Sequence, residues 1–303
     1  MTGFSWRDGV CAQLDAAGIP YEKDAVLSPL TTFRIGGAAA LLCRPQDAAQ
    51  MRGALRLLAE AGVRHYTLGR GSNTLFADEG YDGAVICTGQ LGGVTVDGTD
   101  VTAGAGVSLA ELCKAAQAAG LAGLEFAYGI PGAVGGAVYM NAGAYGGEMK
   151  DVVRTVRCFD AAAEEQMLTA AECAFSYRHS IFEENGGTVL EASFALHPDD
   201  PAAIAARMTE LAARRKAKQP LEWPSAGSTF KRPQGAFAAA LIEQCGLKGM
   251  TVGGAAVSTK HAGFVINTGG ATCADVISLT DQVAAIVKEK TGFVLEREIR
   301  VVR

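Results

Sequence analysis

The sequence contains no closely paired cysteines, no long apolar run and no excess of positive charge. Its eight cysteines include no CxxC pair, whereas disulfide frameworks are typical of short secreted chains and zinc sites need closely spaced ligands. We therefore expect reduced, buried thiols and no metal site. No segment approaches the roughly 18 uninterrupted apolar residues of a membrane helix, and the first residues, MTGFSWRDGVCAQLDAAGIP, lack the basic-then-apolar pattern of a signal peptide. These absences predict a cytoplasmic protein that does not act at a membrane.

The charge balance argues against a nucleic-acid-binding protein. The net charge is −5, from 27 basic and 32 acidic residues, whereas nucleic-acid binding needs a basic surface to meet the phosphates. This balance still allows a local basic pocket for one small anionic ligand. With 303 residues, of which 49% are hydrophobic and 19% charged, the chain is expected to be globular, with two or three domains.

The spacing of apolar residues predicts an α+β fold. Segments with helical spacing, and short alternating runs between turn residues, occur in both halves of the chain. The expected helices are 6–17, 45–62, 108–120, 202–219, 237–245 and 274–288. The expected strands are 39–45, 65–69, 84–89, 93–98, 100–106, 153–160, 187–196 and 292–302, with antiparallel pairing among those between 84 and 106. The segment HPDDP at 197–201 predicts a linker.

Glycine, in contrast, is abundant and clustered. Residues 128–147 read YGIPGAVGGAVYMNAGAYGG, and seven of these twenty are glycine. Because glycine loses more backbone freedom on folding than any other residue, such a cluster implies that something approaches the main chain closely. Gly129, Gly132, Gly135 and Gly136 would let it lie against a flat or polyanionic ligand, with Pro131 directing the turn. Alternatively, they mark strand crossings or bulges.

A second glycine-containing segment, LGRGSN at 68–73, directly follows an expected strand. A Gly-x-Gly turn in this position exposes several main-chain N–H groups in one direction, and Ser72 and Asn73 add polar side chains, so the turn could hold phosphate oxygens. It is neither a G-x-G-x-x-G fingerprint nor a Walker loop, and an ordinary surface turn is the alternative. Two such segments in one chain favour a dinucleotide ligand.

Three further segments carry polar groups that suit an anionic substrate. Arg178, in FSYRHS, could clamp a carboxylate or phosphate with two parallel hydrogen bonds, or it could be a surface ion-pair partner. Ser228, in PSAGSTFKRP, precedes the cations Lys231 and Arg232 but has no G-x-S-x-G elbow around it, so it is either a site residue or a turn serine. Glu298, in LEREIR, shares one face of an expected strand with Glu296, and that face could simply be solvated. His261 is expected to be a hydrogen-bonded structural histidine.

Taken together and in order, these segments resemble the UDP-N-acetylenolpyruvoylglucosamine reductase family, flavoenzymes of bacterial cell-wall synthesis. The matching stretches span almost the whole chain and are TTFRIGG (31–37), LGRGSN (68–73), GIPGAVGGAVYMNAGAYGGE (129–148), SYRHSIF (176–182), PSAGSTFKRP (224–233), VSTKHAGFVIN (257–267) and LEREIR (295–300). The compact length resembles the shorter subtype, which lacks an inserted loop over the substrate.

The resemblance implies a two-part FAD-binding domain of the vanillyl-alcohol oxidase type and a C-terminal α+β substrate domain. It implies a first FAD-binding subdomain over 1–90, joined by the final strand at 292–303, a second over 91–198, and a substrate domain over 199–291. FAD is expected to bind tightly but without a covalent bond. The residues implied in its binding are Arg70, Gly71, Ser72, Asn73, Gly129, Ile130, Gly132, Gly135 and Gly136.

The same resemblance implies the reaction, in which NADPH reduces FAD and reduced FAD then reduces UDP-N-acetylglucosamine enolpyruvate to UDP-N-acetylmuramate. Ser228 resembles the proton donor, and Arg178 with a protonated Glu298 resembles the pair that polarises the substrate carboxylate. A fixed cation and a hydrogen-bond donor stabilise the enolate-like transition state more than the ground state. Lys231, Arg232 and Tyr177 are the implied substrate-binding residues. The enzyme is expected to act as a monomer in the cytoplasm, in peptidoglycan synthesis and cell wall biogenesis, and hence in cell shape, the cell cycle and cell division.

Two other hypotheses fit parts of the sequence. One is a flavin oxidase of the same superfamily, although such enzymes often tether FAD through a histidine near the phosphate turn and residues 69–74 contain none. The other is a non-catalytic nucleotide-binding module, which would be colourless and would not depend on Ser228.

Overall fold

The computed structural model describes residues 6–303, which form two compact units. Unit 1 contains Met1–Lys23, described from Trp6, together with Ala40–Arg70 and Gly83–Arg214. Unit 2 contains Asp24–Ala39, Gly71–Asp82 and Arg215–Arg303. Both units are therefore assembled from separate pieces of the chain. The expected division into domains at residues 90 and 198 stays a prediction.

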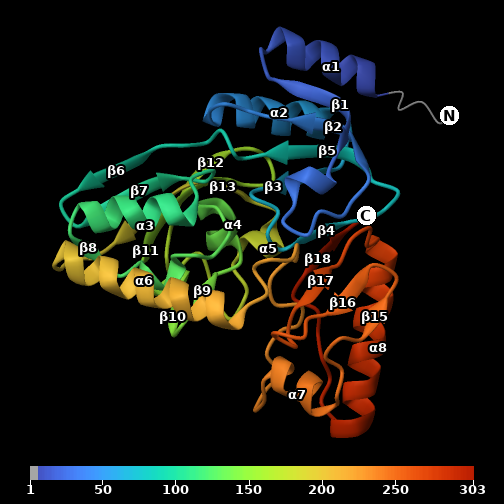
Figure 1. Ribbon diagram of the computed structural model, residues 1–303. Coiled ribbons are helices and arrows are strands. Elements are labelled where there is room, and N and C mark those ends of the chain that lie inside the picture. Colours follow the sequence, from blue (N-terminus) through green and yellow to red (C-terminus); the bar gives the residue numbers. More distant parts are fainter. Residues whose placement is uncertain (1–5) are drawn as a thin grey trace. The chain divides into compact units, whose positions relative to one another are not determined.

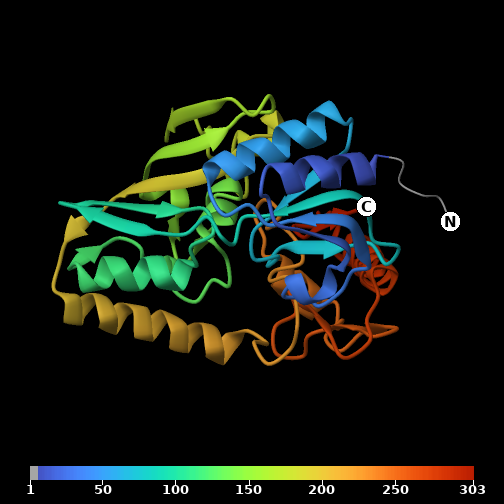
Figure 2. The same cartoon turned by 90° about the horizontal axis from the view of Figure 1, so that it is seen from above.

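The first sheet has the strand order β1-β2-β5-β3 and lies mainly in unit 1. Its strands are β1 (Tyr21–Val26), β2 (Ala38–Cys43), β5 (Tyr81–Cys87) and β3 (His65–Leu68). Helices α1 (Arg7–Ala16) and α2 (Ala48–Glu60) lie side by side in Figures 1 and 2. The side chain of Asp47 caps α2 by accepting a bond from the Gln50 N–H, at 2.8 Å.

The direction of β5 differs from the prediction. β5 pairs parallel with β3, from His65↔Ala84 to Leu68↔Cys87, so the expectation of antiparallel pairing is wrong for this strand. Alternation reports which face of a strand is buried and carries no information on the direction of its partner. The prediction is confirmed for the next pair, since β6 (Val94–Asp97) and β7 (Asp100–Gly104) are antiparallel.

The second sheet of unit 1 is antiparallel throughout and has the order β12-β11-β13-β7-β6. Its other strands are β12 (Glu165–Thr169), β11 (Val153–Phe159) and β13 (Thr188–Ala195). Helices α3 (Leu109–Ala118) and α6 (Pro201–Lys218) run beside one another in both ribbon views, and the Gln117 amide donates to the Pro201 carbonyl at 3.2 Å. The expected linker at 197–201 contains a two-residue strand, β14 (His197–Pro198), which pairs with β8 (Leu121–Ala122).

Several shorter elements complete unit 1. They are the 3-10 turn η2 (Glu125–Ala127), helix α4 (Val134–Tyr139), strands β9 (Gly143–Ala144) and β10 (Gly147–Glu148), the 3-10 turn η3 (Met149–Asp151) and helix α5 (Phe182–Asn185). Three of them, α4, β9 and β10, lie in or overlap the glycine-rich stretch. Sequence periodicity did not predict α4, because two glycines interrupt its apolar pattern.

Unit 2 contains a two-stranded parallel sheet and a three-stranded antiparallel sheet. Strand β4 (Thr74–Phe76) pairs with β18 (Arg300–Val302), and β15 (Thr251–Val252), β16 (Ala255–Val257) and β17 (Val265–Asn267) form the other sheet. The remaining elements are η1 (Ser28–Leu30), α7 (Ala238–Gln244) and α8 (Cys273–Thr291). The expected strand at 292–302 is confirmed only for its last three residues, apart from a bridge between Phe230 and Arg297.

Each unit has a hydrophobic core of its own among the described residues. Phe159, Phe182 and Phe194 are fully buried in unit 1, and Phe33 lies in the core of unit 2. All eight cysteines are free thiols, and seven are buried, with Cys87 partly exposed. This confirms the expectation of reduced, buried thiols.

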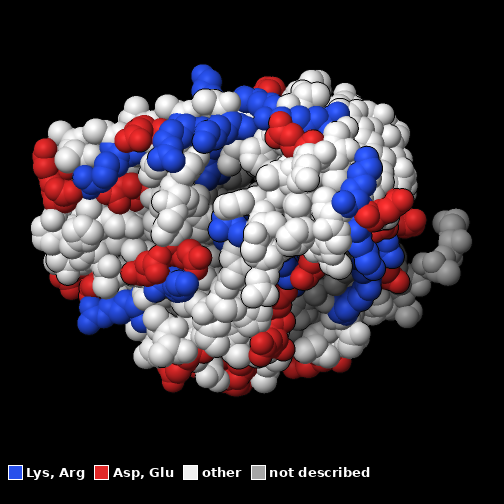
Figure 3. All heavy atoms as spheres, turned by 90° about the horizontal axis from the view of Figure 1, so that it is seen from below, with Lys and Arg blue, Asp and Glu red and all other residues white. Residues whose placement is uncertain are grey.

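Charges of both signs occur together on the surface. In Figure 3, strips of Lys and Arg are interrupted by Asp and Glu, so neither sign covers the face shown. Among the described residues, no helix combines the length and apolar character needed to cross a membrane.

Candidate active site

The turn at 69–73 contains two glycines with different surroundings. Gly71 is buried and left-handed, with φ of +60°, and a Cβ there would lie 2.8 Å from the Thr31 Cα and would also clash with the Leu30 carbonyl oxygen. Its own carbonyl accepts a bond from the Thr32 N–H at 3.2 Å. A Cβ on Gly69 would meet no protein atom within 4 Å. Packing of the protein therefore explains Gly71, whereas Gly69 leaves open space beside the turn.

Asn73 connects this turn to the segment that contains Glu298. Its side-chain amide donates to the Glu298 carbonyl at 3.1 Å, and its own carbonyl accepts from the Arg300 N–H at 3.0 Å. These contacts continue into the parallel pairing of β4 with β18. Two predicted site segments that are more than two hundred residues apart in the chain are thus joined within unit 2.

Ser228 belongs to the same network through its neighbour Thr229. The Thr229 carbonyl accepts from the Glu298 N–H at 2.8 Å, and the Thr229 hydroxyl accepts from the Val265 N–H at 2.8 Å. Thr229 is buried, Ser228 is exposed and Glu298 is half-buried. The structure therefore brings the backbones of Ser228 and Glu298 together and leaves the Ser228 side chain at the surface of the unit.

Other motif stretches join this network in unit 2. The Thr32 hydroxyl donates to the Ser225 carbonyl at 2.7 Å, and the Asn267 amide donates to the Phe33 carbonyl at 3.2 Å. Five of the seven stretches that carry the family resemblance, or parts of them, consequently meet in one unit. They are 31–37, 71–73, 224–233, 257–267 and 295–300.

The two basic residues after Ser228 already have partners. Lys231 Nζ lies 2.5 Å from Glu296 Oε1, and the side chains of this pair are 36% and 70% exposed. The Arg232 guanidinium lies over the Phe237 ring, 4.6 Å from its centroid. Both cations are accessible, so an anionic ligand that bound Lys231 would compete with an exposed carboxylate.

In the glycine-rich stretch of unit 1, two adjacent glycines again differ. A Cβ on Gly135 would lie 2.9 Å from the Ala105 Cβ, and the Gly135 N–H donates to the Ala105 carbonyl at 2.9 Å. Gly136 is exposed, and a Cβ there would meet no protein atom within 4 Å. Gly129 is left-handed with φ of +90° and exposed, and Ile130 is half-buried. The Gly132 carbonyl accepts from the Leu109 N–H at 3.1 Å.

Arg178 lies in unit 1, on a tight turn in which Ser176 and His179 bond to one another through both N–H groups. Its guanidinium donates to the Gly143 carbonyl at 3.3 Å and lies 5.1 Å from the centroid of the Tyr177 ring. Arg178 is half-buried, and Tyr177 is 45% exposed. Arg178 is therefore held in a defined position within its own unit, whereas Ser228 and Glu298 belong to unit 2.

Two polar residues within the stretch 129–148, Asn141 and Glu148, are not among the predicted site residues. Asn141 is fully buried and donates to Glu148 Oε2 at 2.9 Å and to the Ser176 carbonyl at 2.8 Å. Burial alone would raise the pKa of Glu148, but hydrogen bonds from Lys150 and Asn141 and the charge of Arg178 bring that pKa below its ordinary value. The resemblance of 129–148 is the signal that includes both residues, but neither stands out within that stretch by spacing or composition.

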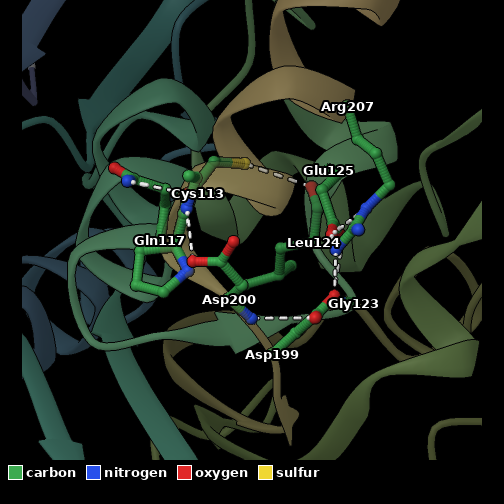
Figure 4. Close-up of polar contacts among 10 residues, drawn as sticks. Cys113, Gln117, Gly123, Leu124, Glu125, Asp199, Asp200 and Arg207 are labelled. Carbon is green, nitrogen blue, oxygen red and sulfur yellow. Dashed lines mark hydrogen bonds and ion pairs between the residues drawn. The ribbon is translucent and has the colours of Figure 1, made fainter.

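A third missed residue, Glu125, anchors the chain just before the glycine-rich stretch. Arg207 donates to Glu125 Oε1 from Nε at 3.0 Å and from Nη2 at 2.7 Å, and Nη2 also lies 2.6 Å from Asp199 Oδ2. The second carboxylate oxygen accepts from the Gly123 N–H at 2.8 Å. Figure 4 shows these side chains pointing toward one another, with the Cys113 thiol directed at the Leu124 carbonyl, 3.2 Å away. Glu125 thereby connects η2 to helix α6.

The arrangement suits an organic cofactor better than a metal ion. Among residues 6–303, no three His, Cys, Asp or Glu side chains form a group that could hold a metal. His261 accepts from the Gly263 N–H at 3.2 Å and contacts Phe264 edge-on, as expected of a structural histidine, and burial lowers its pKa. A Cβ on Gly69 or on Gly136 would meet no protein atom within 4 Å, and main chain that is open in this way fits a phosphate-bearing dinucleotide recognised mainly through the backbone.

Comparison with known proteins agrees with this fit. Residues 39–169 match the family model of an FAD binding domain, and residues 219–302 match that of the UDP-N-acetylenolpyruvoylglucosamine reductase C-terminal domain. The chain is 46% identical over 279 residues to the UDP-N-acetylenolpyruvoylglucosamine reductase of Clostridium perfringens, covering 92% of each chain. It is 42% identical over 289 residues to the Lactobacillus acidophilus enzyme of the same name, covering 95% of this chain and 97% of the relative.

Solved structures give the same result. The crystal structure of UDP-N-acetylenolpyruvylglucosamine reductase from Thermus caldophilus superposes with a TM-score of 0.79 at 35% identity, covering 94% of this chain and 99% of that one. A variant of Phl p 4, a glucose oxidase, has a TM-score of 0.50 at 19% identity over 63% of this chain and 44% of its own, and this likeness shows a shared fold alone. The expected α+β fold and the expected family are confirmed. The chain belongs to the UDP-N-acetylenolpyruvoylglucosamine reductase family and is an FAD-dependent oxidoreductase.

Proposed function

We propose that this protein reduces UDP-N-acetylglucosamine enolpyruvate to UDP-N-acetylmuramate in peptidoglycan synthesis, with NADPH as the reductant. The observation that carries the proposal is the hydrogen-bonded network of unit 2, in which Thr229 and Asn73 hold the backbones of Ser228 and Glu298 together. The proposed chemistry uses a hydroxyl and a carboxyl group, and this network joins the two segments that carry them. The names of the relatives support the same substrate.

The cofactor would be held mainly by main chain, and the residues proposed to hold it are Arg70, Gly71, Ser72, Asn73, Gly129, Ile130, Gly132, Gly135 and Gly136. Bound there without a covalent bond, FAD would supply the hydride chemistry, with NADPH as the source of the hydride. The open space beside Gly69 and Gly136 supports this assignment, as does the absence of a histidine from residues 69–74.

The residues of this chain perform the remaining steps. Hydride addition to the terminal carbon of the enolpyruvyl group leaves negative charge on the neighbouring carbon and its carboxylate. Arg178 and a protonated Glu298 stabilise that charge through hydrogen bonds that strengthen as it develops. The exposed hydroxyl of Ser228 then gives its proton to the neighbouring carbon. A serine is a weak acid, but a carbanion is a strong enough base to accept its proton.

Lys231, Arg232 and Tyr177 are proposed to bind the substrate, with the two cations facing its diphosphate. In this role the enzyme acts as a cytoplasmic monomer and supplies a precursor for the cell wall, and hence for cell shape, the cell cycle and cell division. The division into two FAD-binding subdomains and a substrate domain belongs to the same proposal.

The experiment compares two serines of one loop. Ser228→Ala should leave reduction of FAD by NADPH nearly unchanged and slow reoxidation by the enolpyruvyl nucleotide by about 10²- to 10⁴-fold, the range for loss of a positioned acid. Ser225→Ala is the matched control, because the Ser225 contacts with Thr32 use main-chain atoms of Ser225 and remain in place. Equal slowing of both half-reactions in Ser228→Ala would contradict its role. Rapid peroxide release from the reduced protein without the nucleotide would indicate a flavin oxidase instead.

A further inference from the structure

The turn that carries Arg178 needs support from its surroundings. Tyr177 and Arg178 occupy its two central positions, and Arg178 is left-handed with φ of +57°. A residue with a Cβ rarely adopts this conformation, and it persists only where neighbouring contacts impose it. The contacts that fix this turn therefore determine where the guanidinium points.

Asn141 makes a side-chain contact to the main chain of this turn. Its amide nitrogen donates to the Ser176 carbonyl at 2.8 Å and to Glu148 Oε2 at 2.9 Å, and its amide oxygen accepts from the Lys150 N–H at 2.9 Å. Asn141 is fully buried, and its own φ is +42°, a conformation in which asparagine is more common than other residues with a Cβ. Both N–H groups and the oxygen are used, so the carboxamide has one orientation, which no other side chain of this size can reproduce.

The same amide also holds a carboxylate whose charge acts on the guanidinium, that of Glu148. Gly143 and Glu148 face one another across the β9–β10 hairpin. The Gly143 carbonyl accepts from Arg178 at 3.3 Å, and the Glu148 carboxylate lies close enough for the two charges to interact. Asn141 thus holds the turn on one side and the carboxylate that faces Arg178 on the other.

We propose that Asn141 is a positioning residue for Arg178: it fixes the Ser176–His179 turn against the β9–β10 hairpin, so that the guanidinium meets the substrate carboxylate in one orientation. This inference rests on the proposed function, because it uses the role of Arg178 in the second half-reaction. Asn141 itself contacts neither substrate nor cofactor in this scheme.

The test is a double-mutant cycle on the second half-reaction, with the flavin-loaded enzyme, NADPH and the enolpyruvyl nucleotide. Asn141→Gly removes the carboxamide and tolerates the positive φ. We expect this variant to slow reoxidation of the flavin by about 10- to 100-fold, because a small misplacement of a positioned group can cost about 10²-fold. Reduction of FAD by NADPH should stay within about twofold of the wild-type rate. In an Arg178→Ala background, the same change should cost less than about threefold more, since residues that act through one another are not additive.

Controls separate this effect from a general loss of stability. Thr188→Val removes another buried polar contact of unit 1, the hydroxyl pair with Thr67 at 3.4 Å, and should leave both half-reactions unchanged. If Asn141→Gly does not fold, Asn141→Asp is used in its place. Aspartate keeps the size of the side chain and the acceptor for the Lys150 N–H, but when ionised it cannot donate to the Ser176 carbonyl. This variant should show the same coupling to Arg178.

The other possible outcomes contradict either the role of Asn141 or the role of Arg178. An equal loss from the Asn141 change in both backgrounds, or an equal loss in both half-reactions, means that Asn141 supports the fold and does not position Arg178. Normal reoxidation in Arg178→Ala alone removes Arg178 from the reaction. That result refutes the proposed catalytic site as well as the inference, and no Asn141 variant is needed to see it.

Discussion

The adjacent glycines of α4 should respond to alanine in opposite ways. At Gly136 the new methyl group meets no protein atom, and alanine is about 0.8–1.0 kcal/mol better than glycine inside a helix. At Gly135 the same gain is opposed by a methyl group 2.9 Å from the Ala105 Cβ and 3.3 Å from its carbonyl oxygen. Overpacking of this kind costs about 1–3 kcal/mol. The helix cannot simply move away, because the Gly135 N–H is bonded to the same carbonyl.

The expected stabilities follow from these terms. Gly136→Ala should raise the free energy of unfolding of the apoprotein by up to about 1 kcal/mol. Gly135→Ala should change it by about 0 to −2 kcal/mol, so the two variants should differ by about 1–3 kcal/mol. Urea unfolding of flavin-free protein measures this difference directly.

The effect of Gly136→Ala on FAD affinity should be opposite to its effect on the stability of the apoprotein. If the open space at Gly136 belongs to FAD, Gly136→Ala weakens FAD binding at least about tenfold, or about 1.4 kcal/mol, although it stabilises the apoprotein. Titration of the apoprotein with FAD measures this affinity. An unfolding midpoint as low in Gly136→Ala as in Gly135→Ala would show that Ala105 is not the reason for glycine here. Unchanged FAD affinity in Gly136→Ala would remove this residue from the cofactor site.

Three further results are expected. Burial would raise the pKa of Glu125, but main-chain N–H groups and Arg207 lower it, so its stabilising effect is complete above about pH 4.3 and is lost as the pH falls through the lower folded value. Wild-type protein should therefore lose more stability than Glu125→Gln between about pH 5 and about pH 3 in unfolding titrations, and parallel curves would contradict this. Burial raises the pKa of Cys43 and of Cys113 to about 12. A thiol reagent should therefore modify Cys87 at most under native conditions, and all eight cysteines after unfolding. Rapid modification of several cysteines in the native protein would show that the cores open. Lys231→Ala should change the free energy of unfolding by less than about 1 kcal/mol, because its pair with Glu296 is exposed. The same change should raise the KM for the enolpyruvyl nucleotide, and an unchanged KM would place Lys231 outside the substrate site.

Many of the helices can be predicted from local sequence patterns, namely the spacing of apolar residues and the capping residues. The helices α2, α3 and α8 were predicted because apolar residues recur along one face, and side-chain caps such as Asp47 and Ser108 mark their starts. Helix α4 was not predicted, since glycine is a poor helix former and the contact with Ala105 that requires it is not local. The direction of β5 and the late start of β18 depend on partners elsewhere in the chain, which periodicity does not identify.

The candidate site shows the same division. Motif resemblance selected Ser228, Glu298 and Arg178, and the structure adds that Thr229 and Asn73 join the first two. Asn141 and Glu125 could not be selected, because their partners Ser176 and Arg207 are 35 and 82 residues away along the chain. The role of such an asparagine or glutamate can be recognised only from the residues that folding brings into contact with it. The proposed roles of the site residues stay predictions.

The way unit 2 is assembled has a consequence for biosynthesis. Residues 24–39 and 71–82 leave the ribosome early. However, β4 pairs with β18 at residues 300–302, and the Asn73 amide donates to the carbonyl of Glu298, so both contacts need the end of the chain. Until residues 298–302 have been translated, these bonds of β4 and Asn73 cannot form, and closing so long a loop is slow. A nascent chain that stalls before residue 300 should therefore have a complete set of segments for unit 1, while unit 2 stays open to chaperones and proteases.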